Sequence, residues 1–368
     1  MKALSPILYG KRNKSKVFAS INSIAIAVMF LFILYNILQS MTNTEYRNSI
    51  PKYRNAAEIT SYGQDSANDF LIKQINENEN IERLISTRFD YTLRITFPGS
   101  QDQSVVKPLK KDDVNYFMNK EGIKLVEGRL PKEGTKEIAI NKNVAMNRNI
   151  KIGDLVGDSI NKFDSLPGEY KIVGVLESEA FISIVQANDG DFNSFYAFAK
   201  DGKEDSFEKY INSLPKDKLN ITTEASAYKH FKSVMGALRV IDIIAILSIV
   251  VMVVTVGSSK YAQYYNRKDE FGVLNAIGYN KHFILSKTLK EVSLTNAVGF
   301  VIGIVISLII SILMKKFFWN PMGADGCLFT MKGLIVAFFI PMFTILFSII
   351  PINNLINRLD PIRMIEKN

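Results

Sequence analysis

Long apolar runs dominate the pattern of hydrophobic and polar positions along this chain. Four runs are apolar for about 20 residues each, the length that a helix needs to cross a hydrocarbon core of about 30 Å. A soluble core rarely holds four buried helices this long, three of them close together, so the pattern predicts a membrane protein. The predicted transmembrane helices are residues 17–38, 236–258, 291–314 and 333–355.

The segments between and beside these runs are more polar and define the remaining parts of the chain. The longest connects the first two helices and is large enough to fold around its own core. The predicted fold class is therefore an α-helical membrane protein with four transmembrane helices and a large α+β external domain between helices 1 and 2. The non-membrane segments are residues 1–16, 39–235, 259–290, 315–332 and 356–368.

The first run has two possible interpretations, because basic residues precede it. It could be a cleaved signal peptide, or it could be a membrane anchor that remains in the protein. Its apolar part is longer than a typical signal core, and no small-residue cleavage site follows at "QSMTNTEYR". These features favour an uncleaved anchor.

Basic residues in the short flanks predict the orientation. They concentrate before the first run, between the second and third runs, and after the fourth, whereas the segment 315–332 holds only three. Since cytoplasmic flanks carry the excess of Lys and Arg, both termini and residues 259–290 are predicted to be cytoplasmic. Residues 41–235 are then outside.

The net charge of +9 is unevenly distributed. Residues 41–235 hold 27 Lys and Arg against 29 Asp and Glu, and the remainder holds 18 against 7. The basicity therefore belongs to the cytoplasmic flanks, where it faces anionic membrane lipid. No basic stripe interleaved with aromatic residues occurs, so a nucleic-acid partner is not expected.

Strand and helix patterns alternate in the external domain, which indicates an α+β fold. Ser66 and Asp69 resemble a capping box for the first predicted helix. The single cysteine, Cys327, leaves the domain without a disulfide, so its core must hold it. A continuous helical stalk is predicted from about Thr223 into the second transmembrane helix. Predicted strands are Ser86–Phe97, Lys136–Ile140, Glu169–Glu177 and Ala180–Val185, and predicted helices are Ser66–Asn78, Lys110–Lys120 and Lys203–Leu214.

The cytoplasmic stretch "NRKDEFGVLNAIGYNKHF" lies between the second and third apolar runs. It predicts a helix over residues 263–277, with Phe271, Leu274 and Ile277 along one side. Gly278 suits the position that stops a helix, and Asn280 suits the cap of the next one. The alternative is an ordinary solvated loop that its basic residues keep inside.

Candidate chemistry elsewhere is sparse. The two histidines, His230 and His282, are predicted on opposite sides of the membrane, so no catalytic or metal centre is expected. Asp242 lies at the outer edge of the second transmembrane helix, and we expect it to pair with Arg239. Pro341 and Pro351 are expected to kink the fourth helix.

Small residues recur every fourth position in the third transmembrane helix and form a strip that lets another helix approach closely. Two partners are possible: a helix of a second membrane chain, or helix two or four of the same chain, which we favour. The strip consists of Gly299, Gly303, Ser307 and Ser311.

Three stretches together resemble the FtsX-like ABC permeases of the MacB type. The first is "LVEGRLPKEGTKEIAI…KIGD…YKIVGV" in the external domain, and the third is "RLDPIRMIE" in the tail. The second is the cytoplasmic motif, whose matching positions are Arg267, Glu270, Phe271, Gly272, Val273, Leu274, Ala276, Ile277 and Gly278. MacB carries its ATPase on the same chain, whereas no GxxxxGK[ST] motif occurs here.

The resemblance implies a non-enzymatic permease subunit in a bacterial inner or cytoplasmic membrane, with no cofactor of its own. ATP and Mg would be held by a separate ABC ATPase, which would dock on the cytoplasmic motif as a coupling helix. Other implied partners are a second permease, the same or related, and possibly an external adaptor or membrane-fusion protein.

The implied function is mechanotransmission: ATP use drives external-domain movement and so exports or expels peptides, antibiotics or lipid-like molecules, with antibiotic resistance as one outcome. The alternative is an FtsX-like signalling protein that regulates a cell-wall hydrolase.

Overall fold

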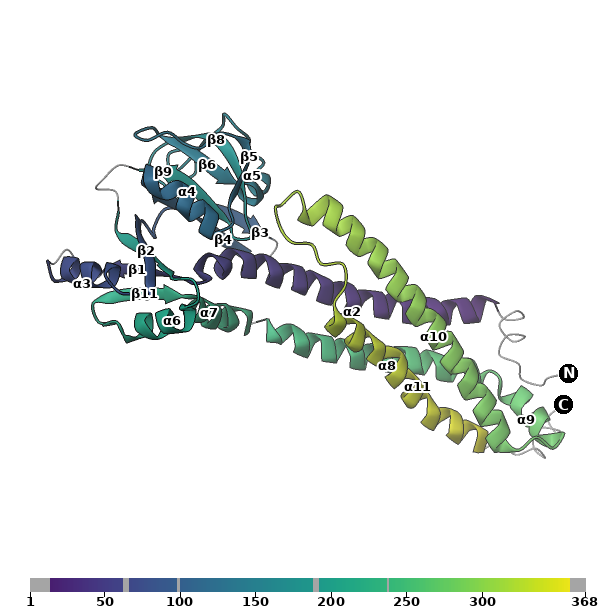
Figure 1. Ribbon diagram of the computed structural model, residues 1–368. Helices are drawn as coiled ribbons and strands as arrows, with labels where there is room; N and C mark the ends of the chain where they lie inside the picture. Colours follow the sequence, from purple (N-terminus) through teal and green to yellow (C-terminus); the bar gives the residue numbers. More distant parts are fainter. Residues whose placement is uncertain (1–13, 62–65, 98–99, 188–191, 237, 358–368) are drawn as a thin grey trace. The chain divides into compact units, whose positions relative to one another are not determined.

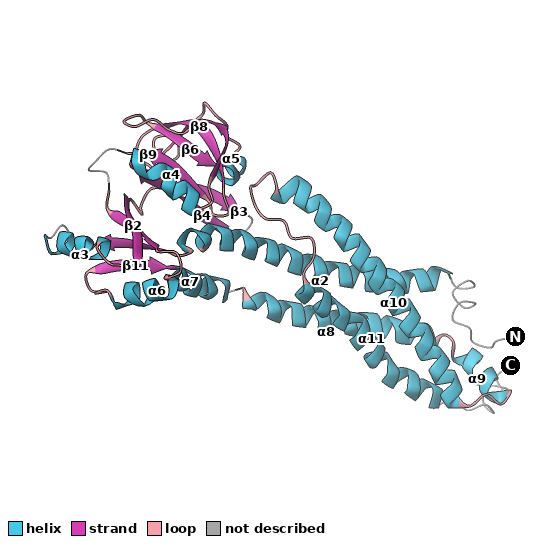
Figure 2. Cartoon of the chain, in the orientation of Figure 1, coloured by secondary structure: helices cyan, strands magenta, loops and turns pink. Residues whose placement is uncertain are grey.

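The chain forms two compact units, seen in a computed structural model that describes residues 14–61, 66–97, 100–187, 192–236 and 238–357 (Figure 1). The helical unit comprises residues 1–39, 238–315 and 326–368, and the external unit comprises residues 40–237 and 316–325. The first is helical and the second mixes strands with helices (Figure 2). The predicted fold class is confirmed, because four of the described helices are long and apolar enough to cross a membrane, and the α+β unit lies in sequence between the first and second of them.

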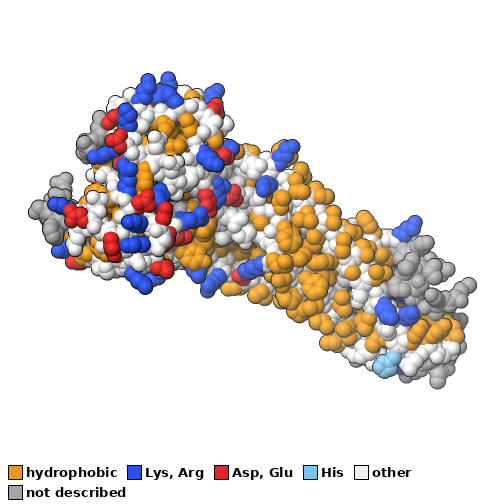
Figure 3. Space-filling view, viewed as in Figure 1, with side chains coloured by type: hydrophobic (Ala, Val, Ile, Leu, Met, Phe, Trp, Pro, Cys, Tyr) orange, Lys and Arg blue, Asp and Glu red, His pale blue; other side chains and the backbone are white. Residues whose placement is uncertain are grey.

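In its described residues, the helical unit is built from four long helices and one short one. Its core is a cluster of aliphatic and aromatic side chains that includes Leu31 and Phe32 of the first helix. Many large apolar side chains remain exposed on these helices, and Figure 3 shows them covering the visible face. This is the surface that a lipid environment accepts without cost. The helices are α2 (Lys14–Ser49), α8 (Arg239–Tyr265), α9 (Lys268–Ala276), α10 (Lys281–Met314) and α11 (Met331–Asn357).

Helix α2 is longer than a membrane span requires. It continues to Ser49, shortly before Pro51 begins a 3₁₀ turn, η1 (Pro51–Tyr53). Proline lacks the N–H that a continuing helix would need, which accounts for the end of α2 in this region. The predicted stalk from Thr223 corresponds to α7 (Glu224–Gly236) and α8, and its continuity rests on residue 237, which lies outside the described residues.

The strip of small residues on α10 packs against α2, which corrects both expected partners. A side chain at Gly299 would collide with Ile24, and one at Gly303 would collide with Val28, each at about 2.9 Å or closer. Ser311 accepts a hydrogen bond from Asn36 of α2 (3.0 Å). The strip is therefore occupied within the chain by the first transmembrane helix, because the glycines allow the backbones to approach closely.

The external unit contains two sheets. The four-stranded sheet has the order β11-β1-β10-β2, and its described neighbours pair antiparallel. The larger sheet has the order β3-β4-β9-β6-β8-β5, with β7 also paired to β8, and it is mixed because β4 with β9 and β6 with β8 are parallel. The strands are β1 (Ala56–Ser61), β2 (Ile81–Thr87), β3 (Thr92–Phe97), β4 (Ser100–Leu109), β5 (Lys124–Gly128), β6 (Glu137–Asn141), β7 (Leu155–Val156), β8 (Tyr170–Glu177), β9 (Ile182–Gln186), β10 (Ser194–Ala199) and β11 (Leu219–Thr223).

Four helices besides α7 cover these sheets: α3 (Ser66–Asn76), α4 (Lys111–Lys120), α5 (Lys142–Arg148) and α6 (Glu204–Ser213). The Ser66–Asp69 capping box concerns side chains outside the described ones. The predicted strand Ser86–Phe97 is wrong as one element, since it is split between β2 and β3. The break holds Arg88 and Asp90, whose side chains form a salt bridge with each other (2.9 Å) instead of lining a strand face.

One core joins the two sheets of the external unit. Tyr196 of β10, Leu176 of β8 and Phe117 of α4 all belong to the same buried cluster. At its polar edge the ammonium of Lys107 on β4 bonds the carboxylate of Glu58 on β1. A buried ion pair thus ties the larger sheet to the smaller one.

Residues 316–325, which follow α10, are also part of the external unit, and we call them the strap. Asn147 of α5 donates a hydrogen bond to the carbonyl of Met322 (2.8 Å), and Asn143 donates one to Gly323 (2.7 Å). Gly323 has φ +64°, and a side chain there would collide with the Asn143 carbonyl. The strap therefore fits closely against α5.

Candidate coupling site around helix α9

The short helix α9 is separated from α8 by a two-residue turn, Asn266 and Arg267, that the sequence pattern did not predict. The expected helix 263–277 was wrong at its start, because residues up to Tyr265 belong to α8 and α9 starts at Lys268. The backbone leaves helical geometry at Arg267 (φ −106°, ψ 10°). Asp269 and Glu270 occupy the first turn, where a carboxylate stabilises the positive end of the helix dipole.

The predicted ends of this region are confirmed. Gly278 has φ +100°, a left-handed conformation that costs glycine little, and it follows the last turn of α9. Asn280 caps α10, since its side-chain oxygen accepts a hydrogen bond from the backbone N–H of His282 (3.0 Å). Together these two residues make a sharp corner between α9 and α10.

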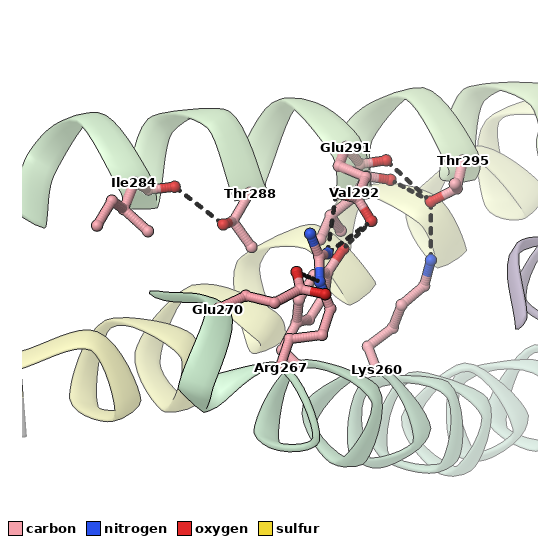
Figure 4. Close-up of polar contacts among 9 residues, drawn as sticks. Lys260, Arg267, Glu270, Ile284, Thr288, Glu291, Val292 and Thr295 are labelled. Carbon is pink, nitrogen blue, oxygen red and sulfur yellow. Dashed lines mark hydrogen bonds and ion pairs between the residues drawn. The ribbon is translucent and has the colours of Figure 1, made fainter. Parts of the chain in front are cut away.

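A buried ionic cluster joins α8, α9 and α10 (Figure 4). The guanidinium of Arg267 donates to both carboxylate oxygens of Glu291 on α10 (3.1 Å each) and to Glu270 (3.0 Å). The Tyr264 hydroxyl donates a hydrogen bond to the carboxylate of Glu291 (3.3 Å). Lys260 of α8 donates to the hydroxyl of Thr295 (2.7 Å).

The cluster fixes the orientation of α9, because its charges have little access to solvent. Lys260 is 2% exposed, Arg267 5% and Glu291 7%. Removing ions from water is costly unless hydrogen bonds compensate, so the contacts of Arg267 and Glu291 strongly favour one geometry. Sequence reasoning missed Lys260 and Glu291 as site residues, although ionisable residues at the ends of apolar runs were an available signal.

The two faces of α9 differ from the expected arrangement. Phe271 is fully buried, in a cluster with residues of α8, α10 and α11 that includes Tyr264 and Ile352. Leu274 is partly buried against the same cluster. The exposed apolar residues are instead Val273, which is 57% exposed, and Ile277, which is 71% exposed.

The nine predicted motif residues therefore divide into two groups. Arg267, Phe271 and Gly272 are buried and anchor α9 within the helical unit. Glu270, Val273, Ala276, Ile277 and Gly278 are exposed, and Leu274 lies between the two groups. The exposed group presents a small apolar surface with a carboxylate at one end. Such a surface suits a protein partner rather than a chemical reaction. Among the described residues, no group of His, Cys, Asp and Glu could hold a metal ion.

Asp242 has different partners from the expected Arg239. Its carboxylate accepts a hydrogen bond from the Tyr35 hydroxyl (2.8 Å) and two from the Lys332 ammonium (2.8 and 2.9 Å). Arg239 is near in sequence, but the folded helical unit brings α2 and α11 to the same carboxylate. Asp242 thus links three helices.

Comparison with known proteins gives a consistent picture of this part of the chain. Residues 243–358 match the family model described as FtsX-like permease C-terminal. The chain is 24% identical over 271 residues to the putative hemin transport system permease protein HrtB of Staphylococcus haemolyticus (strain JCSC1435), a match that covers 71% of each chain.

Two solved structures are similar to part of the chain. The periplasmic region of MacB from Actinobacillus actinomycetemcomitans matches with a TM-score of 0.30 and 11% identity, covering 49% of this chain and 94% of that one. The extracellular domain of the noncanonic ABC-type transporter YknZ from Gram-positive bacteria matches with a TM-score of 0.29 and 12% identity, covering 46% of this chain and all of that one.

Proposed function

We propose that this chain is an ABC transporter permease of the FtsX/MacB type, and that it couples ATP hydrolysis by a separate ATPase subunit to movement of its external unit. ATP and Mg would be held by that subunit, and this chain would be non-catalytic. A second permease chain would complete the assembly in the bacterial inner membrane. Both termini and α9 would face the cytoplasm, in contact with anionic lipid.

The exposed face of α9 carries this proposal. Val273 and Ile277 lie one helical turn apart and expose their side chains, while Arg267 and Phe271 hold the opposite face in place. A rigidly held helix with a small apolar face can transmit a push from a docked partner. A freely moving loop would absorb the same push.

Two features of the chain support transmission to the external unit. Helix α2 is a single element that begins in the helical unit and ends in the external unit. The strap follows α10 directly and is hydrogen-bonded to α5. Displacement of the long helices would therefore act on the external unit at more than one place.

We propose export or expulsion of a peptide, antibiotic or lipid-like molecule as the outcome. An external adaptor protein would be a partner in this export. Hemin is a further candidate substrate, because the Staphylococcus haemolyticus relative is a putative hemin transport permease. FtsX-like signalling to a cell-wall hydrolase is the alternative outcome. Inhibition of ATP-driven efflux by loss of the chain would support export, whereas intact efflux with defective wall cleavage would support signalling.

The docking proposal is tested by photocrosslinking in native bacterial membranes that contain this chain. A photoreactive amino acid at Val273 or Ile277 should capture a P-loop ATPase, identifiable by mass spectrometry. The same amino acid at Phe163, an exposed apolar residue of the external unit, is the control and should not.

A functional test uses the identified ATPase with this chain in nanodiscs. Ile277→Asp and Glu270→Lys should lower co-purification or uncouple ATP turnover from transport. Full coupling in both variants, together with no ATPase captured at α9, would refute the docking proposal.

A further inference from the structure

The external unit contains an open cleft that the coupling proposal does not use. Its volume is about 480 Å³, and its walls come from α6, α7, the end of α2, η1 and β1. That volume lies within the range of small-ligand sites, which is roughly 300–1,000 Å³. The cleft is therefore large enough for a compact organic molecule or a short peptide segment.

The charge of the cleft is strongly one-sided. Four carboxylates line it, Glu204, Asp205, Glu208 and Glu224, and no lysine or arginine does. None of the four takes part in a salt bridge within the described part of the chain. The cleft thus presents a concentrated negative potential that focuses cations.

The fold does not require all of these carboxylates. Glu204, Asp205 and Glu224 lie in first turns of α6 and α7, where the helix dipole favours them. Glu208 lies one turn further along α6, next to Glu204 at spacing i,i+4, where like charges destabilise a helix slightly. The Glu208 carboxylate therefore lowers the stability of α6 slightly, but it would strengthen the binding of a cationic ligand.

Aromatic side chains supply the second half of the site. Tyr46, Tyr53, Phe207 and Tyr228 all line the cleft: Tyr53 and Phe207 are buried in its floor, Tyr46 is half-buried, and Tyr228 is 43% exposed. Tyr228 also stacks on Phe231 (ring centroids 6.1 Å apart), which holds its ring in place. Aromatic faces attract cations and also pack against apolar groups.

We propose that this cleft binds a lipophilic cation, meaning an apolar or aromatic body that carries an ammonium or guanidinium group. The carboxylates would receive the cationic group, and the rings of Tyr46 and Tyr228 would cover the apolar body. Ligand binding here would engage the external ends of α2 and α7. The proposal concerns binding by the external unit alone, so its failure would leave the docking of an ATPase on α9 unaffected.

The test uses the full chain in nanodiscs of zwitterionic phosphatidylcholine, which removes attraction to anionic lipid. The probe is the amidated tetrapeptide Lys-Phe-Lys-Phe, and its matched controls are Gln-Phe-Gln-Phe and Glu-Phe-Glu-Phe. Calorimetry should show binding of the lysine peptide only, and raising the salt concentration should weaken it because exposed charge pairs are screened.

Variants locate the binding. Asp205→Asn combined with Glu208→Gln should weaken binding roughly tenfold, the scale expected for losing two exposed charge pairs. Tyr228→Ala should also weaken it, but with no change in the salt dependence. Asp217→Asn removes an exposed carboxylate of the external unit that does not line the cleft, and should bind as the parent chain does.

Unfolding temperatures of all variants, measured in parallel, distinguish loss of the site from loss of the fold. Equal binding of the three tetrapeptides would overturn the proposal. So would unchanged affinity in the folded Asp205→Asn/Glu208→Gln variant, or equal weakening by Asp217→Asn.

Discussion

The helical unit and the external unit both bury charged side chains, but they use them differently. Around α9, Arg267 and Glu291 join a nine-residue helix to the neighbouring helix α10. In the external unit, Lys107 and Glu58 join an inner strand of one sheet to an inner strand of the other. The first pair orients a small element beside an exposed surface, whereas the second holds a domain together.

This difference teaches that burial of an ion pair does not by itself indicate its role. Losing one partner of either pair leaves the other charge buried, which costs about 3–5 kcal/mol. The consequence depends on what the pair connects. Loss of the Lys107–Glu58 pair should destabilise the whole external unit, whereas loss of the Arg267–Glu291 pair should affect only α9.

The largest effect is expected for Lys107→Met, which leaves the Glu58 carboxylate buried without its ammonium. The external unit should lose about 3–5 kcal/mol of stability, because the pair joins its two sheets. Thermal unfolding followed by limited proteolysis measures this loss. Adding Glu58→Leu should restore much of it, and a double variant as unstable as the single one would contradict the role assigned to the pair.

A somewhat smaller and more local effect is expected for Glu291→Gln. The amide keeps some hydrogen-bonding capacity but removes the negative charge that Arg267 and Lys260 share. We expect a loss of roughly 2–3 kcal/mol from leaving buried charge uncompensated. Hydrogen exchange should accelerate in α9, with the external unit unchanged. Glu270→Gln, at a carboxylate whose side chain is 58% exposed, is the control and should leave exchange in α9 nearly unchanged.

Apolar packing in the helical unit is tested next. Gly303→Leu forces a side chain into Val28 and the Ala25 carbonyl of α2, and such overpacking typically costs about 1–3 kcal/mol. The unfolding temperature in nanodiscs should fall. Val301→Leu, at a residue exposed on the same helix, should be tolerated. Equal effects of the two changes would mean that α10 and α2 do not pack through this strip.

The last effect concerns pH and only the external unit. Burial raises the pKa of Glu121 to about 8, and burial lowers the pKa of Lys52 to about 8. The folded state holds the Glu121 proton more tightly than the unfolded chain, so stability should fall as the pH rises from about 4.5 to 8. The folded state releases the Lys52 proton more easily, so stability should rise again from about pH 8 to 10.5.

These two residues can be tested separately by unfolding across this pH range. Glu121→Gln should remove the fall between pH 4.5 and 8, and Lys52→Met should remove the rise above pH 8. The helical unit offers the internal comparison, since neither variant should change its unfolding. A stability curve that keeps both arms in the two variants would contradict the assignment.

The four long helices of the helical unit could be predicted from the sequence, because the thickness of the membrane sets the length of the apolar run that each one needs. The corner at Gly278 and Asn280 was also predictable, since a left-handed glycine and an asparagine cap are local requirements. Six described strands of the external unit were not predicted: β1, β4, β5, β7, β10 and β11. Their pairing with distant strands compensates for weak local patterns.

The sequence by itself determined the four apolar helices, the presence of a separate α+β domain and the location of the family motif. Each depends on residue type, spacing or a local backbone preference. Only the tertiary structure decided that Phe271 is buried while Val273 is exposed, that Asp242 meets Lys332, and that α10 packs on α2. These outcomes depend on which elements face each other, because burial and ion pairing are set by neighbours far away in the chain.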